Sequence, residues 1–203
     1  MYVDLSQQSP GAIYHLMTQT LIPRPIAWVL SEHENGRLNL APFSYFTGIA
    51  SDPPLLMLSV GKKADGSPKD SRLNILQRKH FTVHIPHPHQ ADLVEASAAP
   101  LQAGDSEIEQ LNLSTVPMAQ HTLPRLENCA IAYACTLYRA DEIGTTPQAL
   151  LFGQIHHIYL SDEIATQDAK GRIAVNAQQA EPLARLGAGF YMHPGTPFKA
   201  TRD

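Results

Sequence analysis

Lys69, Asp70 and Ser71 stand together where turn residues give way to a helical apolar pattern. A lysine supplies positive charge, a serine hydroxyl supplies a hydrogen bond, and the amides of a helix start, near residues 70 to 73, add a favourable dipole. These are the kinds of fixed donor that bind a phosphate dianion in proteins. The same three residues also suit the capped start of an ordinary surface helix, so by themselves they leave both interpretations open.

Residues 39–44, with the sequence NLAPFS, offer a second kind of chemistry. Pro42 interrupts the segment, and a strand that turns at a proline leaves some backbone amides and carbonyls unpaired. Such groups suit the polar edge of a flat ring, whereas the faces of the ring need an apolar slot. The alternative is that Asn39 and Ser44 only satisfy the turn.

The elements that must position these residues can be predicted from the pattern around them. Two apolar runs, residues 26–30 and 38–41, flank Asn35-Gly36, which is a strong signal for a β-hairpin. The run at residues 55–60 follows Pro53-Pro54 and is typical of a buried strand, with the prolines before it.

A helix is predicted from Asp70 or Ser71, as its cap, to about Lys79, followed by a strand over residues 81–85. We expect the helix to turn its apolar side chains inward, and these are Leu73, Ile75 and Leu76.

Later strands and their connections indicate the fold class. Residues 129–138 and 150–160 are predicted strands, separated by a Gly-Thr-Thr-Pro turn. Helices are predicted over residues 90–97 and 106–111, where Ser106 begins a capping box. About six strands without alternating strand and helix units favour a mostly β protein with peripheral helices, built as an antiparallel Greek-key or meander barrel.

The length of 203 residues is within the range of one domain. We therefore expect residues 1–203 to form a single domain, with a helical excursion at about 87–121 and a C-terminal extension at about 161–203.

Composition limits the partners and the compartment. Only 17% of the residues are charged and the net charge is −4, so we expect no nucleic acid and no membrane as partner. No basic, apolar leader opens the chain, which predicts a cytoplasmic protein. Cys129 and Cys135 are six residues apart in one predicted strand, a span of ~20 Å against the ~7 Å that a disulfide allows, so we expect free thiols.

The three histidines His84, His87 and His89 have the spacing at which a strand could present metal ligands. Pro86 and Pro88 break that strand, and no cysteine or carboxylate lies at the usual ligand spacing. We expect no metal site, and a metal-dependent hydrolase is the weakest of the functions considered. Trp28, the only tryptophan, is predicted to be a core residue.

Several motifs in order resemble those of a known family. They are R-P-x-A-x-V from residue 24, N-L-A-P-F-S-x-F at 39–46, D-P-P at 52–54 and K-D-S-x-x-N-I at 69–75. Leu-Ala-Arg-Leu-Gly at 183–187, followed by Tyr191, is similar to a closing segment of the same family. The chain resembles the flavin reductase-like family of FMN-binding split β-barrel proteins.

This resemblance implies an antiparallel Greek-key split β-barrel that binds FMN, usually as a homodimer. It places Lys69 and Ser71 at the phosphate, although the family usually has threonine where this chain has Ser71. Arg24 would add charge near the phosphate. The residues implied to line the flavin ring and its ribityl tail are Ser31, Asn39, Ala41, Ser44, Ser59 and Gly61.

The resemblance also implies an enzyme, an NAD(P)H:flavin oxidoreductase that transfers hydride from NADH or NADPH to FMN. No catalytic side chain is expected, because the cofactor carries the hydride chemistry. A monooxygenase or another acceptor of reduced flavin is a candidate partner. The alternative is an FMN-binding electron-transfer protein that keeps its flavin and serves a protein partner.

Overall fold

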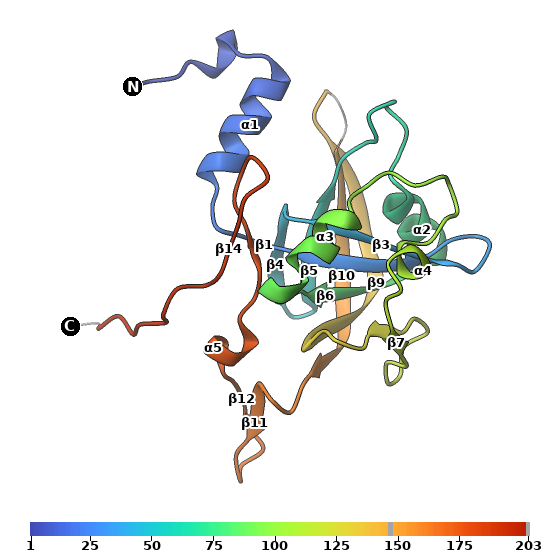
Figure 1. Ribbon diagram of the computed structural model, residues 1–203, viewed down its shortest axis with the longest axis vertical. Coiled ribbons are helices and arrows are strands. Elements are labelled where there is room, and N and C mark those ends of the chain that lie inside the picture. Colours follow the sequence, from blue (N-terminus) through green and yellow to red (C-terminus); the bar gives the residue numbers. More distant parts are fainter. Residues whose placement is uncertain (146–147, 202–203) are drawn as a thin grey trace.

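The computed structural model describes residues 1–145 and 148–201, and its central feature is a curved sheet of seven antiparallel strands (Figure 1). Along the sheet the strands are β3 (Leu38–Phe43), β2 (Ala27–Glu32), β6 (His80–Ile85), β9 (Ile131–Ile143), β10 (Gln148–Leu160), β5 (Pro54–Val60) and β4 (Phe46–Ser51). Because β6 pairs with β2 and β10 returns to β5, the connections are of the Greek-key kind rather than up-and-down.

The sheet curls on itself at a corner of the chain between β3 and β4. These two strands are the edges of the sheet, yet they follow one another directly in the sequence. The amide of Ser59 donates to the carbonyl of Tyr45 at the corner (2.9 Å). The structure therefore confirms the predicted fold class, a mostly β antiparallel split barrel with peripheral helices.

The predicted hairpin of β2 and β3 and the predicted later strands are confirmed, with small shifts at the strand ends. Strands β2 and β3 pair with Ser31 opposite Asn39, and Gly36 in their turn has a φ of 82°, which glycine adopts without strain. Strand β5 begins at Pro54, one residue earlier than predicted. Strands β9 and β10 confirm the predicted pair, but β9 begins at Ile131, two residues later than predicted, so Cys129 lies before it. Thr146 and Pro147 of the predicted turn lie outside the described residues.

Strand β2 is buried on both faces, which explains why its sequence is continuously apolar. Ala27 and Val29 face a core inside the barrel, whereas Trp28 and Leu30 face a second core on the outside. Trp28 is fully buried and its indole N–H donates to the hydroxyl of Ser97 (2.8 Å), so the core prediction is confirmed. Segments after β6 therefore cover one outer face of the barrel.

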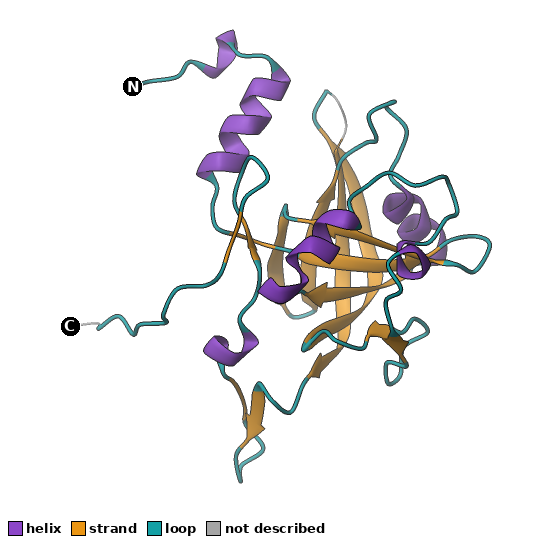
Figure 2. Ribbon diagram, viewed as in Figure 1, coloured by secondary structure: helices purple, strands orange, loops and turns teal. Residues whose placement is uncertain are grey.

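The helices lie outside the sheet (Figure 2). They are α1 (Pro10–Thr20), α2 (Asp70–Arg78), α3 (Ala91–Ala96), α4 (Glu107–Gln110) and α5 (Ala177–Ala180), with 3-10 turns at Leu5–Gln7 and Pro88–Gln90. Of these helices, α1 and α5 stand apart from the sheet. Helices α3 and α4 confirm the two predicted between residues 90 and 111.

Two expectations for α2 are wrong. Its N-cap residue is Lys69, with no side-chain cap, rather than Asp70 or Ser71. Leu73 is 46% exposed instead of inward, because the helix buries Ser71, Asn74 and Ile75 against the barrel. The inner face of α2 therefore begins with a polar pair, which bears on the site below.

The C-terminal residues return to the start of the barrel. They form β11 (Ala165–Gln167), β12 (Ile173–Val175), β13 (Ala184–Arg185) and β14 (Tyr191–Met192), and β13 pairs with β1 (Arg24–Pro25). Two further short strands, β7 (Thr115–Val116) and β8 (Arg125–Leu126), pair with each other. We call residues 183–192 the C-terminal arm, which lies beside α1 in Figure 1.

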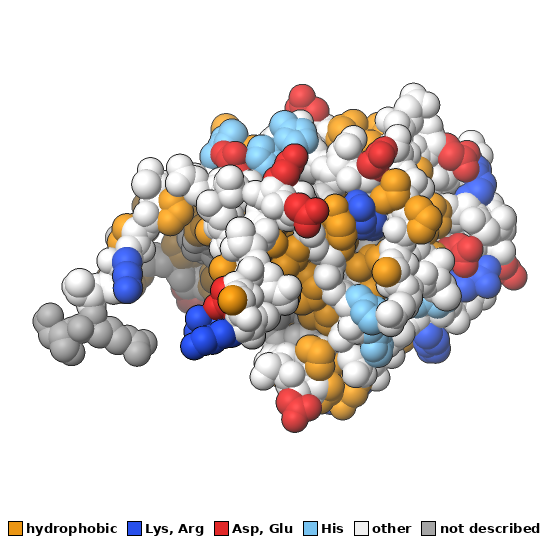
Figure 3. Space-filling model, turned by 90° about the horizontal axis from the view of Figure 1, so that it is seen from below, with side chains coloured by type: hydrophobic (Ala, Val, Ile, Leu, Met, Phe, Trp, Pro, Cys, Tyr) orange, Lys and Arg blue, Asp and Glu red, His pale blue; other side chains and the backbone are white. Residues whose placement is uncertain are grey.

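On the face drawn in Figure 3, Lys and Arg side chains are interspersed with Asp and Glu side chains. Cys129 and Cys135 are both buried and free, as predicted. Among residues 1–145 and 148–201, no helix combines the length and the apolar character needed to cross a membrane.

The ring of His84 is fully buried between two strands, with both nitrogens in use. Its Nε2 accepts from the amide of Leu126 (2.9 Å), so Nδ1 carries the proton and donates to the carbonyl of Trp28 (3.0 Å). Burial lowers the pKa of His84 from 6.5 to about 4. In the described part of the chain, no three His, Cys, Asp or Glu side chains are grouped so as to hold a metal ion.

His84 is predicted to make folding sensitive to acid. Below pH 6.5 the unfolded chain binds a proton at His84 that the folded chain refuses until about pH 4. The free energy of unfolding therefore decreases as the pH is lowered from 6.5 to about 4, by at most ~1.4 kcal/mol per pH unit from this group. Urea denaturation of the wild type and of His84→Gln at several pH values checks this. Equal slopes in the two proteins would contradict it.

Candidate functional site

Three cavities open around Pro42, which lines all of them. The first, of about 290 Å³, lies between the start of α2 and residues 97–101, and we call it the phosphate-side cavity because Lys69 and Ser71, which are expected at a phosphate, line it. The central cavity, of about 510 Å³, lies between β3, β5 and α1. The arm-side cavity, of about 340 Å³, is bounded by α1, α3 and the C-terminal arm. The central cavity shares lining residues with each of the other two, and we call the three together the groove.

Lys69 lines both the phosphate-side and the central cavity. Lys63 has an ion pair with Asp70 (3.0 Å), but Lys69 has none within the described ranges. Its Nζ lies 5.5 Å from the centre of the Phe43 ring. Burial lowers the pKa of Lys69, because no ion pair with a described residue offsets the cost of removing its charge from water.

A buried polar network fixes Ser71 beside that lysine. Ser71 is 1% exposed and its hydroxyl accepts from Nδ2 of Asn39 (2.9 Å). Nδ2 of Asn39 also approaches the hydroxyl of Ser31 (3.2 Å), which accepts from Nδ2 of Asn74 as well (3.2 Å). Because Ser71 accepts from Asn39, its own hydroxyl proton is free to donate into the phosphate-side cavity.

The amides at the start of α2 are partly used by the helix. Those of Arg72 and Leu73 both donate to the carbonyl of Lys69 (3.0 and 3.2 Å). Of the amides of residues 70 to 73, which were expected to bind a phosphate, those of Asp70 and Ser71 therefore remain available at the start of the helix.

The central cavity combines apolar walls with polar groups suited to a ring and a polyol chain. Ser44, Ser59 and Gly61 line it, together with apolar side chains from α1. A Cβ at Gly61 would lie 3.2 Å from Oε1 of Gln148, so glycine keeps this wall open. The hydroxyl of Tyr45 is buried here without a partner among the described residues, which marks an unfilled hydrogen-bonding position.

Arg24 lies at the arm-side cavity, and Lys69 does not line that cavity. The guanidinium of Arg24 donates to the carbonyls of Thr18, Leu21 (2.7 Å) and Leu186 (2.6 Å), and to the hydroxyl of Ser44 (3.3 Å). These bonds occupy the guanidinium with backbone oxygens from α1 and the C-terminal arm. Arg24 thus joins those two segments to the corner that bears Ser44.

At the mouth of the same cavity, a carboxylate holds two side chains of the C-terminal arm. Glu95 accepts from Arg185 (2.7 Å) and from the hydroxyl of Tyr191. These bonds lower the pKa of Glu95.

The predicted site residues thus fall into groups. The phosphate-side cavity brings together Asn39, Ala41, Lys69 and Ser71. The central cavity brings together Ser44, Ser59 and Gly61. Ser31 is fully buried behind Asn39 and lines none of the three cavities. Sequence reasoning missed Lys62, Lys63, Tyr45 and Glu107, which also line the groove. Tyr45 lies within the motif at 39–46 and Lys62 follows the predicted Gly61, whereas only a long-range contact brings Glu107 here.

Known proteins share this fold and much of this sequence. The model of the flavin reductase like domain matches residues 18–179. The chain belongs to the flavin reductase-like family. Nitrilotriacetate monooxygenase component B from Bacillus cereus is 31% identical, with a TM-score of 0.89 over 98% of both chains.

Two further structures support the family assignment and the fold. The 2-nitrobenzoate 2-nitroreductase NbaA from Pseudomonas fluorescens is 27% identical, with a TM-score of 0.87, over 100% of this chain and 96% of that chain. A split-barrel domain structure from Shewanella frigidimarina, at 15% identity and a TM-score of 0.84 over 100% of both chains, shows the same fold. The flavin reductase-like family is flavin-binding, and membership confirms the resemblance drawn from the motifs.

Arg24→Met is predicted to destabilise the protein strongly, because it leaves three inward carbonyls without their donor. We expect the free energy of unfolding to fall by about 2–5 kcal/mol. Arg172→Met, at an exposed ion pair with Asp168, is the control and should change it by less than ~1 kcal/mol. Chemical denaturation measures both. A loss at Arg24 no larger than that at Arg172 would show that the arm is held by other contacts.

Proposed function

We propose that this protein is an FMN-dependent oxidoreductase, an NAD(P)H:flavin reductase that transfers hydride from NADH or NADPH to FMN. The observation that carries this proposal is Lys69, a largely buried cation without an ion pair among the described residues. It stands where two cavities of the groove join. One accepts a phosphate and the other a flat ring.

The phosphate-side cavity fits the phosphate group of FMN. Lys69 supplies charge, the hydroxyl of Ser71 supplies a hydrogen bond, and the amides of Asp70 and Ser71 supply the helix start. A bound dianion would raise the pKa of Lys69 again, since it compensates the cost of burying that charge. Asn39 and, behind it, Ser31 hold Ser71 in place.

The central cavity fits the ribityl chain and the isoalloxazine ring. Ser44 and Ser59 offer hydrogen bonds, Gly61 leaves room, and the unpartnered hydroxyl of Tyr45 can donate to a bound polar group. FMN supplies the acceptor for a hydride, and the protein's part is to bind it, orient it and limit water around it. Ala41 adds apolar surface where the two cavities meet.

The arm-side cavity gives the nicotinamide donor a place beside the ring. It shares Tyr14, Pro42 and Ser44 with the central cavity, so a ligand in it would lie next to the flavin. Arg24 acts here by shaping the cavity wall rather than by binding phosphate. A single domain over residues 1–203 and a homodimer complete the proposal.

The candidate acceptor of reduced flavin is a monooxygenase component. This proposal is supported by the similarity to component B of nitrilotriacetate monooxygenase.

The function is tested by purifying the protein, recording its visible spectrum, and following NADH and NADPH oxidation with added FMN. We expect FMN binding and nicotinamide oxidation that depends on FMN. A protein that binds no FMN and oxidises neither nucleotide would defeat the proposal. Tight retention of FMN with negligible nicotinamide turnover would instead support the electron-transfer alternative.

Lys69→Ala should weaken FMN binding by about 10- to 150-fold, because one charge-assisted phosphate contact contributes ~1.5–3 kcal/mol. Riboflavin, which lacks the phosphate, should bind both proteins alike. Lys170→Ala, at an exposed turn, is the matched control and should leave both affinities unchanged. Fluorescence titration measures all of them. An unchanged FMN affinity in Lys69→Ala would remove Lys69 from the phosphate site.

A further inference from the structure

Helix α4 is attached to the outer edge of β3 by two side chains. Oε2 of Glu107 accepts from the amide of Leu40 (2.8 Å), and the hydroxyl of Ser106 donates to the carbonyl of Leu38 (2.5 Å). Strand β3 is an edge of the sheet, so these backbone groups have no neighbouring strand on that side in the described part of the chain. The two side chains take the place of the missing strand.

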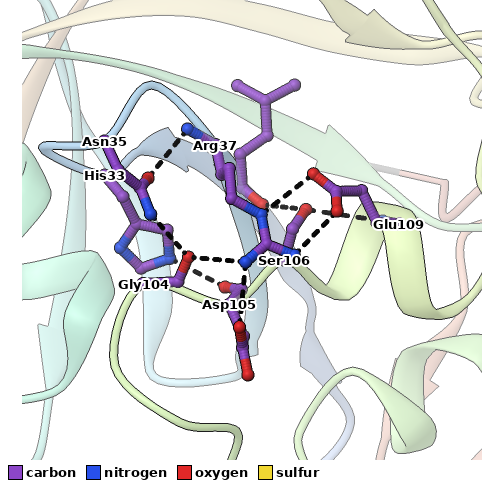
Figure 4. Close-up of polar contacts among 8 residues, drawn as sticks. His33, Asn35, Arg37, Gly104, Asp105, Ser106 and Glu109 are labelled. Atoms are coloured by element: carbon purple, nitrogen blue, oxygen red, sulfur yellow. Dashed lines mark hydrogen bonds and ion pairs between the residues drawn. The ribbon is translucent and has the colours of Figure 1, made fainter.

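The segment that carries Glu107 is held firmly against the β2–β3 hairpin (Figure 4). Arg37 donates to Asp105 (2.9 Å) and forms two bonds to Glu109 (3.1 and 2.7 Å), and Asn35 donates to the carbonyl of Gly104 (3.0 Å). These contacts lie on either side of Glu107 in the sequence. Its carboxylate therefore has a fixed position.

That position is in the wall of the phosphate-side cavity. Glu107 is 7% exposed and lines this cavity together with Lys69 and Ser71. Its partner Leu40 adjoins Asn39, whose side chain binds Ser71. Within the described residues Glu107 forms no ion pair, so no cation of the cavity neutralises it directly.

A carboxylate at this place has a cost that a neutral acceptor would avoid. Burial raises the pKa of Glu107, and the nearby carboxylates of Asp70 and Asp105 raise it further, while the Leu40 amide opposes the change. A glutamine could accept the same hydrogen bond from Leu40. What glutamate adds is negative charge, next to the pocket that would receive a dianion.

We propose that Glu107 limits the affinity for FMN by opposing the charge of its phosphate, and so keeps the flavin exchangeable. This inference rests on the proposed function and specifies it. The protein would treat FMN as a substrate that it binds, reduces and releases, rather than as a permanently bound group. Lys69 attracts the phosphate, and Glu107 sets a limit to that attraction.

The test compares FMN and riboflavin binding to the wild type and to Glu107→Gln, at about pH 8.5, because high pH favours the ionised form of a carboxyl whose pKa is raised. Removing a buried charge of the same sign should tighten FMN binding by about tenfold or more and slow FMN dissociation. Riboflavin affinity should not change. Fluorescence titration and stopped-flow dissociation give the two readouts.

Two matched variants separate charge from positioning. Glu163→Gln removes the same charge at an exposed turn that does not line the cavity, and should change neither affinity. Ser106→Ala removes the other bond between α4 and β3 without changing the charge, and should weaken FMN and riboflavin alike. Glu107→Ser, which is also uncharged, provides a second measurement should Glu107→Gln not fold.

The outcomes discriminate between the two proposals. An FMN affinity that is unchanged in Glu107→Gln, or a parallel weakening of both flavins, would overturn the role given to Glu107 and leave the reductase proposal intact. A wild-type protein that binds neither flavin would defeat the proposed function itself. Tightening confined to FMN supports the inference.

Discussion

The open edge of β3 is the constraint on which the groove depends. Within residues 1–145 and 148–201 no strand pairs with this edge, so its polar groups must be satisfied by other means. Side chains of Ser106 and Glu107 serve Leu38 and Leu40, and Pro42 has no amide to satisfy. A further strand at this position would fill the space where three cavities now meet. The barrel can therefore hold a ligand here because its sheet stops at β3.

Local patterns predicted the parts of the fold that local physics determines. Asn35-Gly36 identified the hairpin, and the continuous apolar run of β2 followed from burial on both faces. The position of Arg24 could not be read from its neighbours, because one of its partners, Leu186, is 162 residues away. The predicted burial of Leu73 was wrong because the inner face of α2 was assigned to apolar side chains, whereas it contains Ser71 and Asn74.

The candidate site combines local motifs with charges that only the fold brings together. Lys69 and Ser71 are neighbours in sequence, and the resemblance located both. Glu107 belongs to a separate helix and reaches the cavity through its bond to Leu40. A cation and an anion then face one pocket without pairing. Such an arrangement suits a ligand that has to be bound and later released, which the fold alone would not reveal.

The most direct measurement is a crystal structure of the protein with FMN. The account predicts the phosphate within hydrogen-bonding distance of Nζ of Lys69 and the hydroxyl of Ser71, with the ring in the central cavity against Pro42 and Tyr45. A phosphate bound instead in the arm-side cavity, near Arg185, or a flavin bound outside the groove, would contradict it.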